Sequence, residues 1–355
     1  MSDADLAASI PTEAAAVSAV GMFPVGLAET YHLLVLADDV TVEEVEALAL
    51  SQDPDAGWIG ASRLQVMAGA TLQGPWPIDD DLRRLFDLPD WAAQVMILAC
   101  DRSRAPALPE ALVGTDPLLD AFPDAQPAGT ELVALTRLRA IARRLAGAIR
   151  VADSGAVVVP DPDRSTAMTI YAPVWLTPDG AAHLLSAVAP GLGVQLDAPV
   201  PPGPARGLES LDEQAQEQLL ATLGAERLEE AWRRVRELEA QTQDPGHEVL
   251  LDGYAVTAPV EEGRSGWGRV SVMVRGSELL PLAVQGEAWA GGGVIQFEVR
   301  WEPLDPADAY SEHVSRGRRH ERRAAAGLIE ALATALVGAV GGVVVDDDGF
   351  LIDLS

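Results

Sequence analysis

Residues 31–44 read YHLLVLADDVTVEE, and this stretch decides the fold that we expect for the chain. The apolar run predicts a strand, and Thr41 with Glu44 matches the Ser/Thr-x-x-Glu capping box that begins a helix. Residues 168–179 read MTIYAPVWLTPD, which again predicts a strand followed by a helix. There Thr177 is the cap, and Pro178 occupies the first helical position, where a missing N–H is tolerated. The chain therefore contains two strand–helix openings of the same kind.

Short motifs recur in the same order after each opening. The first series is Gly57-Trp58, Val66-Met67 and Gln73-Gly-Pro-Trp76, and the second is Gly266-Trp267, Val272-Met273 and Gln285-Gly-Glu-Ala-Trp289. Each series is followed by an apolar strand, a long helix and a Gly/Val-rich strand, at 155–159 and at 342–345. These parallels favour an internal duplication. The unequal spacing of the tryptophan motifs leaves open the alternative of two coincidentally similar stretches.

The order of elements predicts an α+β fold made of two pseudo-repeated ferredoxin-like domains of the βαββαβ type. Mixed or antiparallel sheets with helices packed on one face would follow. We expect a first domain at 28–165 and a second at 166–355, the second with an inserted helix at 209–241. Residues 1–27 are Ala-rich and weakly periodic, which predicts a flexible N-terminal arm.

Composition excludes several classes of function. The chain has 355 residues, a formal net charge of −29 at pH 7 and a single cysteine. This charge repels phosphate backbones and anionic lipid surfaces, so we expect neither a nucleic-acid partner nor a membrane. One cysteine excludes an intrachain disulfide, and the first residues lack the positive charge of a signal peptide, which favours a cytoplasmic protein. The sequence contains no lysine, which excludes a Walker A loop and a Schiff-base cofactor, and we expect no cofactor.

One acidic group and one cysteine are candidates for chemistry. Residues 346–348 are three adjacent aspartates before Gly349, and their spacing lacks the alternation of a calcium loop. A turn that closes a hairpin into residues 350–353 is the preferred interpretation, with no metal. Cys100 follows an apolar strand, and we expect a small buried residue there rather than a nucleophile.

Five arginines within eight residues stand out on this acidic chain. They are Arg316, Arg318, Arg319, Arg322 and Arg323. In a functional interpretation they bind an anion, a phosphate or an acidic surface of a partner. In a structural interpretation they neutralise nearby carboxylates such as Glu312, Glu321 and Glu330 at helical spacings.

Four tryptophans lie beside glycine or proline rather than within apolar stripes. They are Trp58, Trp76, Trp267 and Trp289. Exposed tryptophans would anchor a ligand or a partner, whereas buried ones would cover the edges of the sheets.

The sequence favours a non-enzymatic, soluble binding or regulatory protein. Its protein or anionic partner would be contacted through the groove between the domains and the arginine-rich helix start. The alternative is a hydrolase or metal-assisted enzyme that uses Asp161, Asp163 or residues 346–348 with His313 or His320. No motif assigns a catalytic residue, and the sequence does not determine the oligomeric state.

Overall fold

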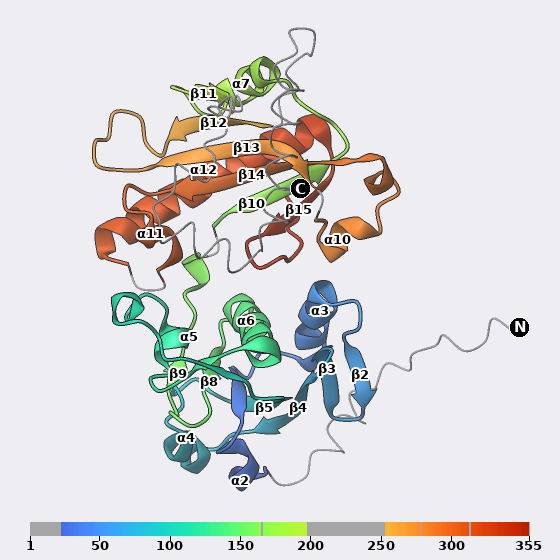
Figure 1. The fold of residues 1–355 in the computed structure, drawn as a ribbon, viewed down its shortest axis with the longest axis vertical. Coiled ribbons are helices and arrows are strands. Elements are labelled where there is room, and N and C mark those ends of the chain that lie inside the picture. Colours follow the sequence, from blue (N-terminus) through green and yellow to red (C-terminus); the bar gives the residue numbers. More distant parts are fainter. Residues whose placement is uncertain (1–22, 165, 197–252, 278, 312–313, 355) are drawn as a thin grey trace, which may run out of the picture.

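The computed structural model describes residues 23–164, 166–196, 253–277, 279–311 and 314–354 (Figure 1). These residues form two halves, one stacked on the other, and each half is an antiparallel sheet accompanied by helices. The α+β class expected from the sequence is confirmed. The helix expected at 209–241 lies outside the described residues.

The first half is built on a seven-stranded sheet in the order β2-β3-β4-β5-β1-β8-β9. Its strands are β1 (His32–Leu36), β2 (Gly57–Gly60), β3 (Arg63–Met67), β4 (Ala70–Pro77), β5 (Gln94–Cys100), β8 (Ala148–Arg150) and β9 (Val157–Val158). Its helices are α2 (Val25–Ala28), α3 (Val42–Gln52), α4 (Asp80–Phe86), α5 (Pro117–Asp120) and α6 (Gly129–Arg144), with short turns η1 (Glu110–Leu112) and η2 (Pro162–Arg164). A separate two-stranded ladder pairs β6 (Arg104–Ala105) with β7 (Gln126–Pro127).

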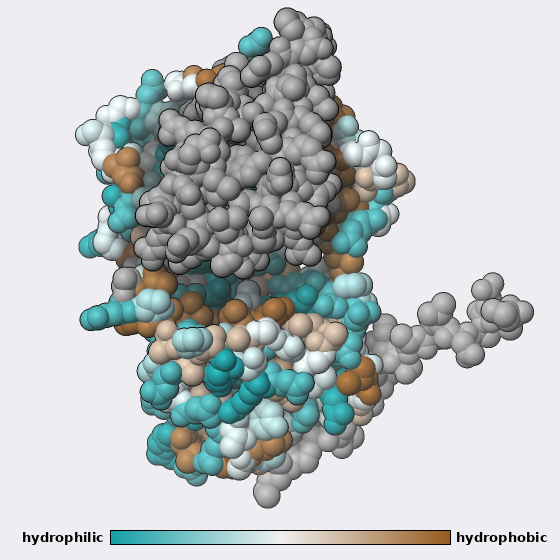
Figure 2. Space-filling view, viewed as in Figure 1, coloured by the Kyte–Doolittle hydropathy of each residue, from teal (hydrophilic) through white to brown (hydrophobic). Residues whose placement is uncertain are grey.

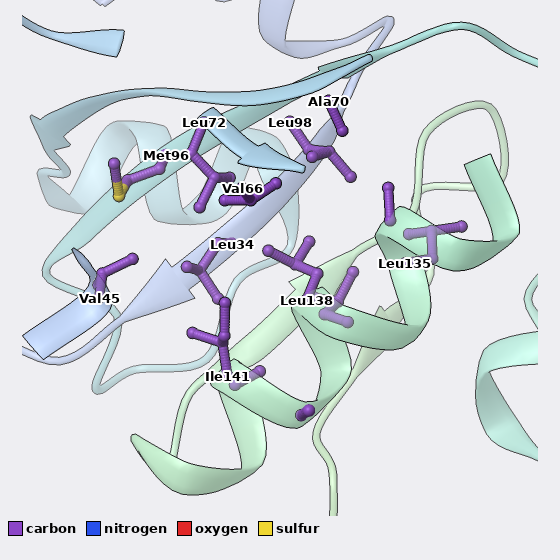
Figure 3. Close-up of a cluster of buried hydrophobic side chains, with 14 of the residues drawn as sticks. Leu34, Val45, Val66, Ala70, Leu72, Met96, Leu98, Leu135, Leu138 and Ile141 are labelled. Atoms are coloured by element: carbon purple, nitrogen blue, oxygen red, sulfur yellow. The ribbon is translucent and has the colours of Figure 1, made fainter. Parts of the chain in front are cut away.

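Apolar cores lie on both faces of this sheet because the central strand β1 is buried along its whole length. On one face, leucines and a methionine of the strands pack against α6, as Figure 3 shows for Leu34, Met96, Leu98, Leu135 and Leu138. The other face carries a second core that includes residues 33 and 35 of β1 and residues of α2 and α4. The expectation of helices on one face is therefore wrong for this half, since alternate β1 residues are equally apolar.

The described end of the expected N-terminal arm is packed rather than free. Phe23 is 9% exposed and belongs to the core that faces α2 and α4. Its ring meets Trp76 at 5.9 Å and Phe86 at 5.7 Å, both edge to face. Aromatic burial of this kind orders a chain end, so the arm cannot extend to residue 27. Residues 1–22 lie outside the described residues.

The second half is built on a six-stranded sheet in the order β11-β12-β13-β14-β10-β15. Its strands are β10 (Met168–Ala172), β11 (Gly193–Leu196), β12 (Gly253–Pro259), β13 (Arg269–Ser277), β14 (Val294–Glu302) and β15 (Val343–Asp346). Its helices are α7 (Pro178–Ser186), α10 (Leu282–Gln285), α11 (Ala307–Tyr310) and α12 (Arg316–Val340), with the short turn η4 (Ala290–Gly292). Within the described residues, α12 is the one helix long and apolar enough to cross a membrane. Its Ile329, Leu332 and Leu336 belong to the core of this half, as in a core helix of a soluble fold.

The two sheets have the same strand order when their strands are matched by position. In this match β2, β3, β4, β5, β1 and β8 correspond to β11, β12, β13, β14, β10 and β15, and β9 is an additional edge strand. Among the described residues, four strands of the main sheet lie between the two long helices of each half, whereas a βαββαβ unit has two. The ferredoxin-like order is therefore corrected. The sequence pattern missed this because β2, β3 and β4 are short and joined by tight turns, so they merge into one apolar stretch.

The strand registers show that the recurring motifs are not structurally equivalent. Trp58 lies in β2 and pairs with Leu64, a position that Val194 of β11 occupies in the second half. Trp267 instead lies in the connection between β12 and β13. Val157 lies in the additional strand β9, whereas the counterpart of β15 is β8. The motif alignment was therefore wrong, although the strand orders of the two halves agree.

A turn at the end of the chain joins the halves. As the sequence predicted, Asp346 N donates to Phe350 O at 2.9 Å, and Val345 pairs with Leu351 across the turn. The side chain of Asp348 accepts two hydrogen bonds from Arg143 of α6 at 2.6 and 2.7 Å. Phe350, 2% exposed, belongs to the core of the first half. The last residues of the chain thus complete the packing of the first half.

Hydrophobic residues also gather where the halves face each other. Figure 2 shows them along the rim of the first half that lies next to the second half. Helices α3 and α6 lie on this side in Figure 1, and on α6 Leu132 and Val133 are 36% and 44% exposed.

Candidate functional site

The arginine-rich segment forms the first turns of α12. Ser315 caps this helix, with its Oγ accepting a hydrogen bond from Arg318 N at 3.3 Å. Because residues three and four apart share a helix face, the spacing places Arg316, Arg319, His320 and Arg323 on one side. All four side chains are exposed. We call these four residues the basic face.

Two of the predicted binding residues turn toward the fold instead. Arg318 Nε lies 2.9 Å from Asp308 Oδ2, and its Nη1 lies 2.6 Å from Glu321 Oε2. Arg322 is 1% exposed and donates to the carbonyl oxygens of Asp308 and Ser311 at 2.8 and 2.9 Å. These two arginines hold the connection between β14 and α12, as the structural interpretation of the cluster requires.

A buried carboxylate fixes the same end of α12 to the sheet. Glu321 is 1% exposed, and its Oε1 accepts hydrogen bonds from Gly268 N at 2.7 Å and from Trp301 Nε1 at 3.2 Å. Its Oε2 pairs with Arg318. Each carboxyl oxygen of this buried side chain therefore has a polar partner, which offsets the cost of burying it.

The basic face lines a cavity. The cavity has a volume of about 600 Å³ and is bordered by Val314 and the four residues of the basic face. Arg323 pairs with Asp163 at 3.1 Å. In the part of the chain that the structure describes, no carboxylate pairs with Arg316 or Arg319. Guanidinium groups in this setting accept bidentate contacts from carboxylate or phosphate oxygens.

A second, smaller cavity adjoins the first. It has a volume of about 240 Å³, and His320 borders both cavities. The guanidinium of Arg264 lies 4.0 Å above the ring of Trp267. The ring of His320 meets Trp267 edge to face at 5.6 Å. A stacked aromatic and guanidinium pair thus lies directly beside the basic face.

The four candidate tryptophans do not form one site. Trp58 packs partly on one core of the first half, Trp76 on the other, and Trp267 on the core of the second half. Trp289 precedes η4 and is half-buried. Of the four, the structure places Trp267 beside the arginine cluster, and the other three do not line either cavity.

The acidic residues of the enzymatic alternative act as partners of arginines. Asp161 lies 3.4 Å from Arg322, and Asp163 lies 3.1 Å from Arg323. Asp346 and Asp348 belong to the turn and pair with arginines of α6 at 3.7 and 2.6 Å. Among the residues that the structure describes, no three His, Cys, Asp or Glu side chains are grouped so as to hold a metal ion. His313 lies outside them.

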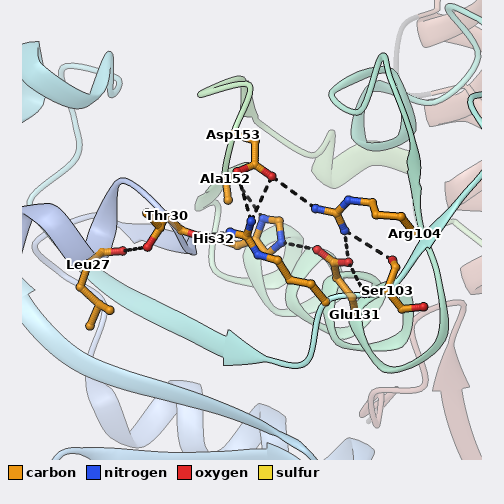
Figure 4. A network of polar contacts seen from close by, with 9 residues as sticks. Leu27, Thr30, His32, Ser103, Arg104, Glu131, Ala152 and Asp153 are labelled. Carbon is orange, nitrogen blue, oxygen red and sulfur yellow. Dashed lines mark hydrogen bonds and ion pairs between the residues drawn. The ribbon is translucent and has the colours of Figure 1, made fainter.

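Sequence reasoning missed a buried polar network in the first half, drawn in Figure 4. His32 is 1% exposed and Glu131 is fully buried, and His32 Nε2 lies 3.0 Å from Glu131 Oε1. Ala152 N donates to His32 Nδ1 at 3.0 Å, so the proton of a neutral imidazole resides on Nε2. Glu131 Oε2 accepts from Ser103 N at 3.1 Å and from Arg104.

This network is internally neutralised. Burial by itself would raise the pKa of Glu131, but hydrogen bonds from His32, Arg104 and Ser103 N and the charge of Arg104 lower it to about 2. Both nitrogens of His32 are used, which leaves none for a substrate. The sequence offered one signal, a histidine inside the apolar run 32–36, but its partner on α6 is 99 positions away.

Cys100 has the properties of a structural residue. Its side chain packs against the core of the first half. Burial and the negative charge of Glu131 raise the pKa of its thiol to about 11, despite the nearby Arg102 and Arg104. A thiol with this pKa is a poor nucleophile at neutral pH.

No protein-family model, curated protein or solved structure matches this chain. Its function is therefore argued from the chemistry of the described residues. The buried network and the acidic turn are already paired within the protein, whereas the basic face lines a cavity. We therefore take the basic face as the candidate functional site.

Proposed function

We propose that this chain is a non-enzymatic binding protein that recognises an anionic group through the basic face of α12. The observation that carries the proposal is the cavity in which Arg316, Arg319, His320 and Arg323 converge. Arg316 and Arg319 have no acidic partner within the described residues, although the chain has 54 acidic residues against 25 basic ones. An anion on this face would relieve the mutual repulsion of the guanidinium groups.

The arginines of the cluster fall into two groups: some are bonded within the protein, and others are exposed and available to a ligand. Arg318 and Arg322 are bonded to backbone carbonyls of their own half and to acidic side chains, which are Asp308 and Glu321 for Arg318 and Asp161 of the first half for Arg322. Exposed ion pairs contribute only about 0–1 kcal/mol each, so stability alone is a weak reason for the two exposed arginines that lack such partners. Planar guanidinium groups orient phosphate and carboxylate oxygens, which gives a binding reason for their presence.

The remaining features favour binding over catalysis. Asp161, Asp163 and Asp348 of the enzymatic alternative are paired with Arg322, Arg323 and Arg143, and both nitrogens of His32 are engaged by the protein. All residues lining the basic cavity belong to 314–323, so the proposal concerns the start of α12. A contact through the groove between the halves and a cytoplasmic location both stay predictions.

We also propose that the two halves, 28–165 and 166–355, arose by internal duplication. The support is the common strand order of the two sheets, with a long helix before the last matched strand of each. Four described strands of the second half are longer than their counterparts, and the arginine cluster at the start of α12 has no equivalent run at the start of α6. Binding at the basic face would then be a property of the second half.

The test is a titration of the full chain with pyrophosphate by isothermal calorimetry at low ionic strength. We expect saturable binding that weakens as salt is added, because the contact is between exposed charges. The double substitution R316Q/R319Q should reduce the affinity at least about tenfold, since each charge-assisted contact contributes about 1.5–3 kcal/mol.

The matched control is R63Q/R84Q, which removes the same charge from exposed positions of the first half. It should leave the pyrophosphate affinity within about twofold of the unsubstituted protein. Equal weakening by both double substitutions would reduce the effect to net charge and contradict the proposal. The absence of saturable binding in the unsubstituted protein would contradict it as well. Circular dichroism and urea denaturation verify that both variants are folded.

A further inference from the structure

The smaller cavity, beside the basic face, has a lining that suits a planar group better than a second anion. Its lining combines Arg264, Trp267 and His320 with the first residues of α12. Glu321 also borders it, which disfavours an additional negative charge at that point. The two cavities share His320, so one ligand could occupy both.

Arg264 and Trp267 form a stacking platform. The guanidinium lies 4.0 Å above the indole, and the Arg264 side chain is 45% exposed, so its outer face is accessible. Glu261 Oε2 accepts a hydrogen bond from Arg264 Nη1 at 2.9 Å, which holds the guanidinium plane over the ring. Planar bases stack on aromatic side chains and on guanidinium planes of this kind.

We infer that the anionic ligand of the basic face also carries a planar aromatic ring, the chemistry of a nucleoside diphosphate. The phosphates would contact Arg316 and Arg319, and the base would stack on the Arg264–Trp267 platform next to His320. This inference rests on the proposed function, because it assigns a ligand class to the same site. It adds the smaller cavity and its two platform residues to that site.

A mononucleotide fits the charge of the molecule better than a polynucleotide does. The formal net charge of −29 opposes the approach of a long phosphate backbone, whose charges extend over the acidic surface. A diphosphate concentrates its charge within reach of the basic face, where short-range bidentate contacts outweigh the screened repulsion of distant carboxylates. The ring then contributes affinity that does not depend on charge.

The experiment compares ADP, pyrophosphate and adenosine by isothermal calorimetry on the full chain. We expect ADP to bind at least about fivefold more tightly than pyrophosphate, because stacking of one base contributes about that factor or more. Adenosine alone should bind most weakly. The substitution R264Q should bring the ADP affinity to within about twofold of the pyrophosphate affinity, while pyrophosphate binding changes by less than about twofold.

Three further measurements separate the outcomes. R269Q removes one exposed charge from the same half and should preserve the preference for ADP. On ADP addition W267F should lose most of the tryptophan fluorescence change and W289F should keep it, which reports stacking at Trp267 even if R264Q perturbs the loop. If ADP and pyrophosphate bind equally and both require Arg316 and Arg319, this inference is wrong and the proposed function stands. If neither ligand binds, both are wrong.

Discussion

Each half buries a glutamate near the start of its second long helix. Glu131 is the third residue of α6, and Glu321 is the sixth residue of α12. Each accepts one hydrogen bond from a backbone N–H and one from an arginine side chain. The donors to Glu131 are Ser103 N and Arg104, and those to Glu321 are Gly268 N and Arg318. Glu131 lies in the first turn of α6, where a carboxylate is also favoured by the helix dipole. The two acids thus connect a helix start to its sheet by similar chemistry at different positions.

The carboxylate of Glu131 gives the folded chain a defined response to acid. Its pKa in the folded protein, about 2, lies below the ordinary value of 4.5. The stabilisation from the charged form is therefore complete above about pH 4.5 and is lost as the pH falls toward 2. We expect E131Q to lower the free energy of unfolding by about 3 kcal/mol at pH 7 and by much less at pH 2.5.

Urea denaturation of both proteins at pH 7 and pH 2.5 measures this difference. E330Q, which changes an exposed glutamate on α12, is the control and should have little effect at either pH. An E131Q deficit of the same size at both pH values would show that the amide disturbs packing and that the charge of Glu131 is not the source of the stability.

At the scale of helices and strands, local chemistry predicted where elements begin. The capping box of Thr41 and Glu44 is present at the start of α3, and Thr177 caps α7 with Pro178 at the first helical position. The Asp-Gly sequence before Phe350 forms the predicted turn. These features depend on neighbouring residues, so a single sequence contains the information that specifies them.

The pairing of strands that are distant in sequence could not be predicted from such local signals. The Gly-Trp and Val-Met motifs suggested equivalent positions, but Trp58 and Trp267 lie in a strand and in a loop, and β8 rather than β9 matches β15. Alternation identifies a strand without identifying its neighbour. The same limit applies to the site: the arginine run was visible, whereas its partner Asp308 and the neighbouring Trp267 are brought in by the fold.

In both halves a glycine connects the second long helix to the last matched strand: Gly147 between α6 and β8, and Gly342 between α12 and β15. A Cβ on Gly147 would lie 2.6 Å from Val35 O, and a Cβ on Gly342 would lie 2.1 Å from Tyr171 O. Val35 and Tyr171 are matched positions, since Leu34 and Ile170 each precede them in the central strand. Gly342 also has a φ of 102°. Close approach of two backbones therefore requires a residue without a side chain at this step.

We expect G342A to lower the free energy of unfolding by at least about 2 kcal/mol, because alanine meets both the carbonyl and an unfavourable φ. G338A is the matched control, since a Cβ on this exposed glycine of α12 meets nothing within 4 Å. It should be neutral or raise stability by up to about 1 kcal/mol, through the better helix propensity of alanine. Thermal unfolding followed by circular dichroism distinguishes the two, and equal melting temperatures would contradict the account of this step.

At the scale of the whole molecule, the final turn makes the first half dependent on the end of the chain. Arg143 of α6 is buried and pairs with Asp348, and Gln52 of α3 donates to Asp348 O at 3.3 Å. Phe350 occupies the core beneath the same helices. The first half therefore completes its packing with residues more than 180 positions beyond its last strand, β9. Both of its long helices, α3 and α6, therefore contact the turn at Asp348.

Two adjacent aspartates of this turn should respond oppositely to neutralisation. D348N weakens a pair in which the Arg143 side chain is 3% exposed, and loss of a partner from a buried ion pair costs about 3 kcal/mol. Burial and the charge of Asp348 raise the pKa of Asp347, so its ionised form is disfavoured in the folded protein at neutral pH. D347N removes that charge and should leave stability unchanged or slightly higher.

The comparison is made by urea denaturation at pH 7, with intrinsic tryptophan fluorescence reporting both halves. D348N should lower the midpoint, and D347N, one residue away with the same change in charge, should not. Any advantage of D347N should shrink on acidification: a carboxyl with a raised pKa takes up its proton in the folded state first, so the unsubstituted protein loses the cost of the charged form as the pH falls toward 4. If both substitutions lower the midpoint equally, the turn stabilises the protein through its backbone alone, and the pairing of Asp348 with Arg143 does not hold the halves together.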